Sequence, residues 1–144
     1  MLTDTLIATV LGLPPSVRLA LLDADPAGLG WLCFTTGDGS GFDPHLRQLG
    51  VSARKDQDTR NSVEHGIAWL PSNPLTVLSV ASDLYSQTAR GRDCWPHAAR
   101  AIGRKWVLYL MATDANGESR AVVSAEDVDP LVAAVEVLRE VCRG

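Results

Sequence analysis

Histidines and cysteines are the side chains in this sequence best suited to acid–base, nucleophilic or metal chemistry. His45, His65 and His97 lie about 20 and 32 residues apart, so no two share the i, i+4 spacing that places two ligands on one helix face. The sequence also lacks a Cys-x-x-Cys motif. It therefore predicts neither a metal site nor a cofactor, although a site assembled in space from Asp43, His45 and His65 stays open.

A second candidate pair is Cys94 with His97. The residues between Asp93 and Ile102 read as a short helix that ends at Gly103, and such a helix would place Cys94 and His97 on roughly one face. A helix N-terminus near Arg90 and Arg92 would favour a reactive thiolate, whereas Asp93 would oppose it. Catalytic Cys and His usually come from separate segments, so chance proximity is the competing interpretation.

A glycine-rich loop, Gly-Asp-Gly-Ser-Gly at 37–41, follows an expected strand. Backbone N–H groups in such a loop can bind phosphate. However, the loop has neither the Lys-Ser/Thr of a P-loop nor the spacing of a dinucleotide fingerprint, and Asp38 and Asp43 would repel an anion. A plain surface turn is the interpretation that the residues favour.

Charge is distributed unevenly along a chain whose formal net charge is −4. Residues 1–43 and 106–144 are acidic, whereas the middle segment 44–105 is basic. Within that segment aromatic and basic residues are interleaved between 90 and 105, and seven of them form the predicted binding surface: Arg90, Arg92, Trp95, His97, Arg100, Arg104 and Lys105.

An Arg/Trp-rich surface of this kind is typical of protein interfaces, because the residues that contribute most to binding there are enriched in Trp, Tyr and Arg. Arginine also binds phosphate and carboxylate through two parallel hydrogen bonds. The alternative is that these arginines pair with the acidic ends of their own chain. The acidic pI of about 5.2 argues against general DNA binding, which rewards a broad basic surface.

Length and composition indicate one intracellular domain. A chain of 144 residues with 46% hydrophobic and 21% charged residues matches a single globular domain over 1–144. Three widely spaced cysteines suggest reduced thiols in a cytoplasm, and the apolar runs are too short to cross a bilayer. Of the 13 basic residues 11 are Arg, which suggests a GC-rich bacterial or phage gene.

The order of expected elements favours an α+β fold with a mainly antiparallel sheet, and a mostly helical fold is the alternative. Helices are expected at 4–11, from Asp43-Pro44 to Gly50, from Pro74 to about 88 and at 93–102; 17–22 is ambiguous between helix and strand. Strands are expected at 29–36, 64–70 and 105–113. Residues 52–62 read as a polar exposed loop. Asp114-Ala115-Asn116-Gly117 predicts a hairpin turn, which is followed by an amphipathic helix from Pro130.

The sequence thus predicts a small interaction protein that binds another macromolecule, a protein in the first instance, through the Arg/Trp-rich surface. Nucleic acid or another anionic ligand is an alternative partner, and a homo-oligomer stays open. A competing hypothesis is an enzyme acting on a phosphate-containing or nucleotide substrate, with a site built from His45, His65, Cys94 and His97. No membrane association is expected.

Overall fold

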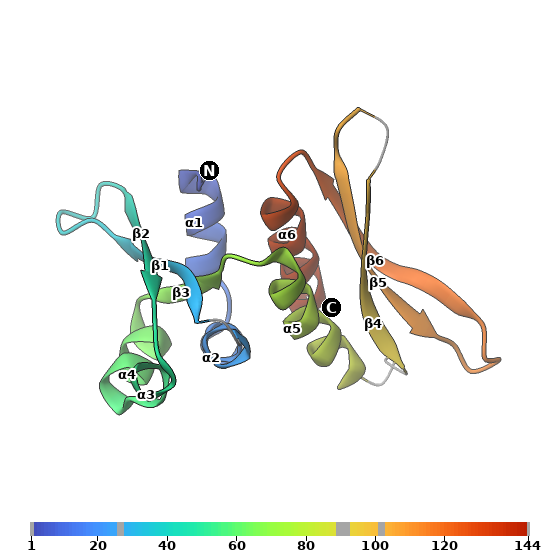
Figure 1. Ribbon diagram of the computed structural model, residues 1–144, viewed down its shortest axis with the longest axis horizontal. Helices are drawn as coiled ribbons and strands as arrows, with labels where there is room; N and C mark the ends of the chain where they lie inside the picture. The colour runs from blue at the N-terminus through green and yellow to red at the C-terminus, as the bar shows by residue number, and fades with distance from the viewer. Residues whose placement is uncertain (1, 26–27, 89–92, 101–102, 144) are drawn as a thin grey trace. The chain divides into compact units, whose positions relative to one another are not determined.

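The computed structural model describes residues 2–25, 28–88, 93–100 and 103–143 (Figure 1). The chain divides into two compact units, unit 1 at 1–73 and unit 2 at 74–144. Each unit contains helices and one three-stranded antiparallel sheet, which confirms the predicted α+β fold. The expectation of one domain over the whole chain stays a prediction.

Unit 1 contains four helices and the sheet β2-β1-β3. The helices are α1 (Asp4–Leu11), α2 (Pro15–Ala24), α3 (Val51–Lys55) and α4 (Gln57–His65). The strands are β1 (Leu29–Thr35), β2 (Phe42–Gln48) and β3 (Ala68–Pro71). The ambiguous segment 17–22 is therefore helical, since Pro15 at its first turn fixes a helical φ and Val17, Leu21 and Leu22 are buried.

Helices contact the sheet of unit 1 through two different sets of side chains. Because side chains alternate along a strand, Leu32 and Trp69 point to one face, where they pack with Leu22 of α2 and Val63 of α4. Helix α1 also contacts all three strands, and its Leu6, Ile7 and Val10 are buried. The small core of unit 1 is thus centred on Trp69, which is fully buried.

Unit 2 contains α5 (Pro74–Ser86), β4 (Cys94–Arg100), β5 (Trp106–Thr113), β6 (Ser119–Asp127) and α6 (Pro130–Arg143). The strands form the antiparallel sheet β4-β5-β6. The hairpin of β5 and β6 followed by an amphipathic helix confirms the C-terminal prediction, and α5 confirms the helix expected from Pro74.

Both helices of unit 2 lie on one side of its sheet (Figure 1). Helix α5 contacts β4 and β5, while α6 contacts β5 and β6. Accordingly Leu108, Leu110 and Ala112 of β5 are buried beneath the helices, whereas the residues between them are only half-buried. The opposite side of the sheet is hereafter called the outer face.

Three secondary-structure predictions are wrong, and tertiary pairing explains two of them. Residues 42–48 form strand β2 instead of a helix, because they pair along their whole length with β1. Residues 94–100 form strand β4 instead of a helix, because they pair along their whole length with β5. Pro44 and Pro96 suggest helix starts or breaks, but both lie in edge strands, where the lost N–H costs no ladder hydrogen bond.

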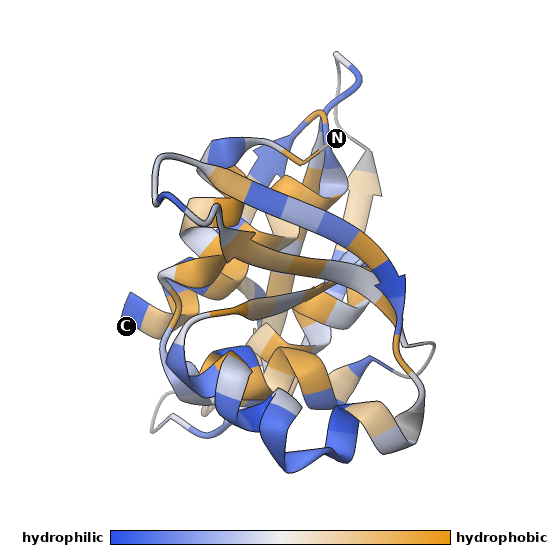
Figure 2. Ribbon diagram, turned by 90° about the vertical axis from the view of Figure 1, so that its left-hand side faces the viewer, coloured by the Kyte–Doolittle hydropathy of each residue, from blue (hydrophilic) through white to orange (hydrophobic). Residues whose placement is uncertain are grey.

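The third error concerns residues 52–62, which form most of α3 and α4 instead of a loop. Asp56 caps α4 by accepting a hydrogen bond from the backbone N–H of Thr59 at 3.2 Å. One apolar side chain, that of Val63, anchors this otherwise polar helix in the core. The hydrophilic colouring of α4 in Figure 2 shows why periodicity alone did not reveal it.

Among the described residues, no single helix has the length and apolar composition needed to span a membrane. Helices α1 and α2 satisfy the criterion only when taken together, and the chain bends by 108° between them.

Candidate protein-interaction surface

The outer face of unit 2 is defined by strand register. Residues paired across the three strands form successive rows, since directly opposed residues point to the same side of a sheet. One row joins Trp95, Met111 and Ala121; the central row joins His97, Tyr109 and Ser124; the third joins Ala99, Val107 and Glu126. A bulge beside Leu110 and Met111 inserts Val122 into β6 between the first two rows.

Aromatic side chains occupy the middle of the outer face. The rings of His97 and Tyr109 stack with their centroids 5.0 Å apart and an interplanar angle of 24°. In the adjoining row Trp95 is 37% exposed, beside the half-buried Met111. An exposed indole next to half-buried apolar side chains is typical of an interface core. The indole ring is rigid, and removing its apolar surface from water favours binding.

Basic side chains lie at one end of the outer face, where β4 turns into β5. Arg104 and Lys105 are both exposed there. Lys105 Nζ lies 3.7 Å from Glu126 Oε1, whereas no ion pair joins Arg104 to another described residue. Gly103 and Arg104 have φ values of 84° and 67°, so an arginine occupies a left-handed position that ordinarily favours glycine or asparagine.

The predicted Arg/Trp-rich surface is thus spread along the sheet rather than concentrated. Trp95 lies near the start of β4, and Arg104 lies beyond its other end. His97 lies between them on the outer face, and Lys105 lies beside Arg104. Of the other predicted binding residues, Arg90 and Arg92 fall outside the described residues. Arg100 is described only by its backbone, at the end of β4.

Tyr109, Met111 and Val107 are outer-face residues that the sequence reasoning missed. The strand at 105–113 is apolar at nearly every position, so alternation could not separate its two sides. The available signal was the pairing of two strands: once 94–100 is known to be a strand, Trp95, His97 and Ala99 all point the same way.

The edges of this sheet are poorly suited to pairing with another strand. Edge strand β4 contains Pro96, which has no N–H to donate, and edge strand β6 carries the bulge at Val122. Recognition by side chains on the outer face is therefore favoured over the addition of a strand.

The enzyme hypothesis rests on four residues, of which two lie in unit 1 and two in unit 2. In unit 1, His45 on β2 stacks on Phe34 and lies 3.3 Å from Asp43 Oδ2. His65 ends α4, and its Nδ1 donates to the carbonyl oxygen of Asn61 at 2.8 Å. Both imidazoles thus have local partners, and a site that unites them with Cys94 and His97 stays a prediction.

Cys94 and His97 do not share a face. Both belong to β4, and side chains separated by an odd number of strand residues point to opposite sides of the sheet. Cys94 is paired with the buried Ala112 and points toward the helices, whereas His97 points to the outer face. The expected thiolate–imidazole pair required both side chains on one face of a helix. The strand conformation of β4 removes that arrangement.

The glycine-rich loop forms the turn between β1 and β2. Asp38 Oδ1 accepts hydrogen bonds from the hydroxyl groups of Thr36 and Ser40, both at 2.7 Å, and from the backbone N–H of Ser40 at 3.0 Å. These donors lower the pKa of Asp38 to about 2. The loop thus satisfies its own donors with a carboxylate, as a surface turn does.

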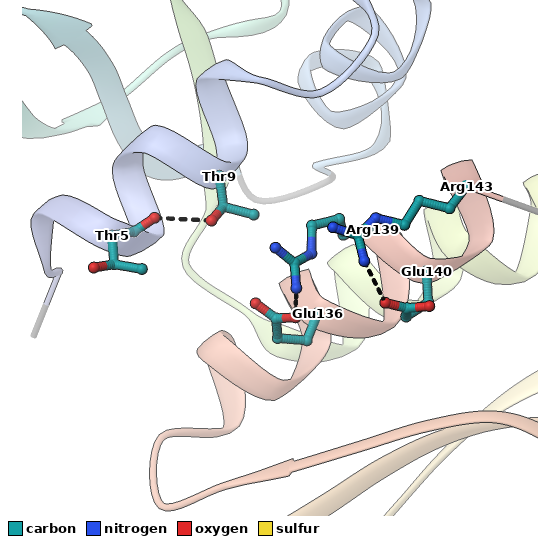
Figure 3. A network of polar contacts seen from close by, with 6 residues as sticks. All are labelled: Thr5, Thr9, Glu136, Arg139, Glu140 and Arg143. Carbon is teal, nitrogen blue, oxygen red and sulfur yellow. Dashed lines mark hydrogen bonds and ion pairs between the residues drawn. The ribbon is translucent and has the colours of Figure 1, made fainter.

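A pocket of about 620 Å³ lies within unit 2 and is lined by residues of α5, β6 and α6. Its carboxylates are Glu126, Glu136 and Glu140. Each of them already contacts a cation: Glu136 Oε2 lies 2.7 Å from Arg139, and Glu140 Oε1 lies 3.1 Å from Arg143 (Figure 3). Glu126 is paired with Lys105, so the lining carries no uncompensated carboxylate that selects a ligand.

Metal ligation finds no support in the part of the chain that the structure describes, where no three His, Cys, Asp or Glu side chains come together in a metal-binding arrangement. Comparisons with known proteins do not identify a family. No family model matches the chain, and no match was found among curated proteins or solved structures.

Proposed function

We propose that this protein is an interaction module that binds a partner protein through the outer face of unit 2. The observation that carries the proposal is the 37% exposure of Trp95 beside the His97–Tyr109 stack, on a side of the sheet that neither α5 nor α6 covers. Residues that contribute most of the binding energy at interfaces are enriched in Trp, Tyr and Arg.

The chemistry of the face defines the partner's surface. The middle of the face is apolar and aromatic, so it fits an apolar surface without buried charge. Arg104 at one end has a guanidinium that pairs with a carboxylate through two hydrogen bonds. The partner's contact surface is therefore apolar with a carboxylate at one end, and an acidic protein fits better than a nucleic acid.

Capture experiments with matched variants test this function. The tagged protein is used to recover partners from its host, and Trp95→Ala is compared with Val128→Ala, which truncates a 66% exposed side chain outside the three rows. A stoichiometric partner should be retained by the wild type and by Val128→Ala but lost with Trp95→Ala, at an unchanged melting temperature. If both variants retain the partner equally, the proposed function is wrong.

Charge reversal at Arg104 is a second test of the proposed function. Arg104→Asp should weaken the complex, because it places a carboxylate opposite the partner's carboxylate. Aspartate tolerates the left-handed backbone conformation at this position, so the variant should keep its melting temperature. A large fall in melting temperature together with lost binding would show instead that Arg104 is structural.

A further inference from the structure

We infer that the partner which the outer face fits is a second copy of this chain, packed face to face about a two-fold axis with the strands of the two copies antiparallel. This inference rests on the proposed function, since it needs the outer face to be a binding surface. It names the occupant and the orientation in which it binds.

Side-chain sizes along β4 are complementary under this symmetry. A two-fold axis that runs across the strands at the central row exchanges the first and third rows of the outer face. The large Trp95 then lies over the partner subunit's Ala99, and Met111 lies over the partner subunit's Val107. His97 and Tyr109 lie near the axis and face their own copies, as in an isologous interface.

Charges at the two ends of the face are also complementary. Arg104 lies at one end, where Lys105 is already paired with Glu126, while Asp93, which is exposed, immediately precedes β4 at the other. The antiparallel arrangement brings Arg104 toward the partner subunit's Asp93, and the same contact occurs twice in the dimer. A parallel arrangement would instead place Arg104 near its own copy, and like charges repel.

The area of the face indicates which class of interface the dimer would belong to. Three strands of seven to nine residues present about 400 Å² of flat sheet per copy at ordinary strand spacing. That area, about 800 Å² over both copies, is smaller than in stable dimers and belongs to the weak, transient class, so we expect a reversible dimer with a dissociation constant of about 10–100 µM. Pro96 and the β6 bulge disfavour the competing edge-to-edge dimer.

Complementary charge variants test the inference by sedimentation equilibrium. Arg104→Asp alone sets Asp against Asp93, and Asp93→Arg alone sets Arg against Arg104, so each should raise the dimer dissociation constant by about tenfold or more. Mixing the two variants restores opposite charges at both contacts and should restore wild-type dimerisation. Arg47→Asp, an exposed arginine of β2, is the matched control and should dimerise as the wild type does.

Two results would overturn the inference: a wild type that stays monomeric well above the micromolar range, or a mixture that dimerises no better than either variant. Failure of the proposed function is a different result. If the wild type is monomeric but Trp95→Ala still loses a host partner, the self-association is wrong and the binding face stands. If the wild type is monomeric and Trp95→Ala changes no capture, both are wrong.

Discussion

Arg18 Nε donates a hydrogen bond to the backbone carbonyl oxygen of Val63 at 2.9 Å, which ties α2 to the end of α4. The same guanidinium donates to the carbonyl oxygens of Leu11 and Leu13 at 3.2 and 2.6 Å, and to that of Glu64 at 2.7 Å. These carbonyls lie at or just beyond the last turns of α1 and α4, where helices leave carbonyl groups without an internal partner. One buried cation thus satisfies two helix ends, whose partial negative charge favours it.

Replacement of Arg18 by Met should destabilise unit 1 strongly. The change removes four hydrogen bonds and leaves buried carbonyl groups unpaired, so we expect a loss of about 3 kcal/mol or more in the free energy of unfolding. Urea denaturation followed by circular dichroism measures it. Arg60→Met is the control, since Arg60 forms a surface ion pair with Asp23, and its replacement should change the free energy of unfolding far less than that of Arg18. Equal losses in the two variants would contradict the structural role of Arg18.

Gly30 should not tolerate a methyl group. A Cβ atom at Gly30 would lie 2.5 Å from the carbonyl oxygen of Leu70 and 2.8 Å from the ring of Trp69, both held in the core. Gly30→Ala should therefore lower the free energy of unfolding by about 1–3 kcal/mol. Gly50→Ala is the control, because Gly50 has φ −68° and its Cβ would meet open space. If Gly30→Ala leaves the free energy of unfolding in urea unchanged, β1 and β3 can separate enough to admit the methyl group.

Elements with an internal pattern were predictable from the sequence, and elements defined by a partner were not. The stripe of Leu131, Val135 and Leu138 identifies α6 without any neighbour. By contrast, β2 exposes Leu46 and contains Pro44, so only its pairing with β1 makes it a strand. Helix α4 has a single apolar anchor, and its cap at Asp56 looks like any polar loop residue.

The candidate site was predictable only in part for the same reason. Trp95, His97 and Lys105 could be selected by residue type, because exposed aromatic and basic groups near one another are unusual. Their alignment on one side of a sheet depends on the strand conformation of 94–100, which the sequence suggested was helical. Tyr109 and Met111 followed from cross-strand register, which no local pattern contains.

Acid should weaken the turn between β1 and β2 through Asp38. Its folded-state pKa of about 2 lies below the ordinary value of 3.8, because the backbone N–H and hydroxyl of Ser40 and the hydroxyl of Thr36 stabilise the carboxylate. Its contribution to stability is therefore complete above pH 3.8 and is lost as the pH falls toward 2.

An NMR titration of the Asp38 carboxyl carbon measures this pKa. Ser40→Ala should raise it only part of the way to 3.8, because the backbone N–H of residue 40 still donates. Ser52→Ala, an exposed serine of α3, should leave the pKa of Asp38 unchanged. A wild-type pKa near 3.8 would contradict the hydrogen-bonded turn.

Cys33 should resist thiol reagents until the protein unfolds. Burial raises its pKa from 9.0 to about 12, so the folded protein holds a neutral, inaccessible thiol at pH 8. Mass spectrometry after labelling with a disulfide reagent should find Cys33 unmodified in buffer and modified in urea. Because the folded-state pKa is the higher one, stability should also fall as the pH rises from 9 toward 12, and Cys33→Ala should remove that part of the alkaline loss. Labelling of native Cys33 at the rate of the half-buried Cys94 would contradict the burial of Cys33.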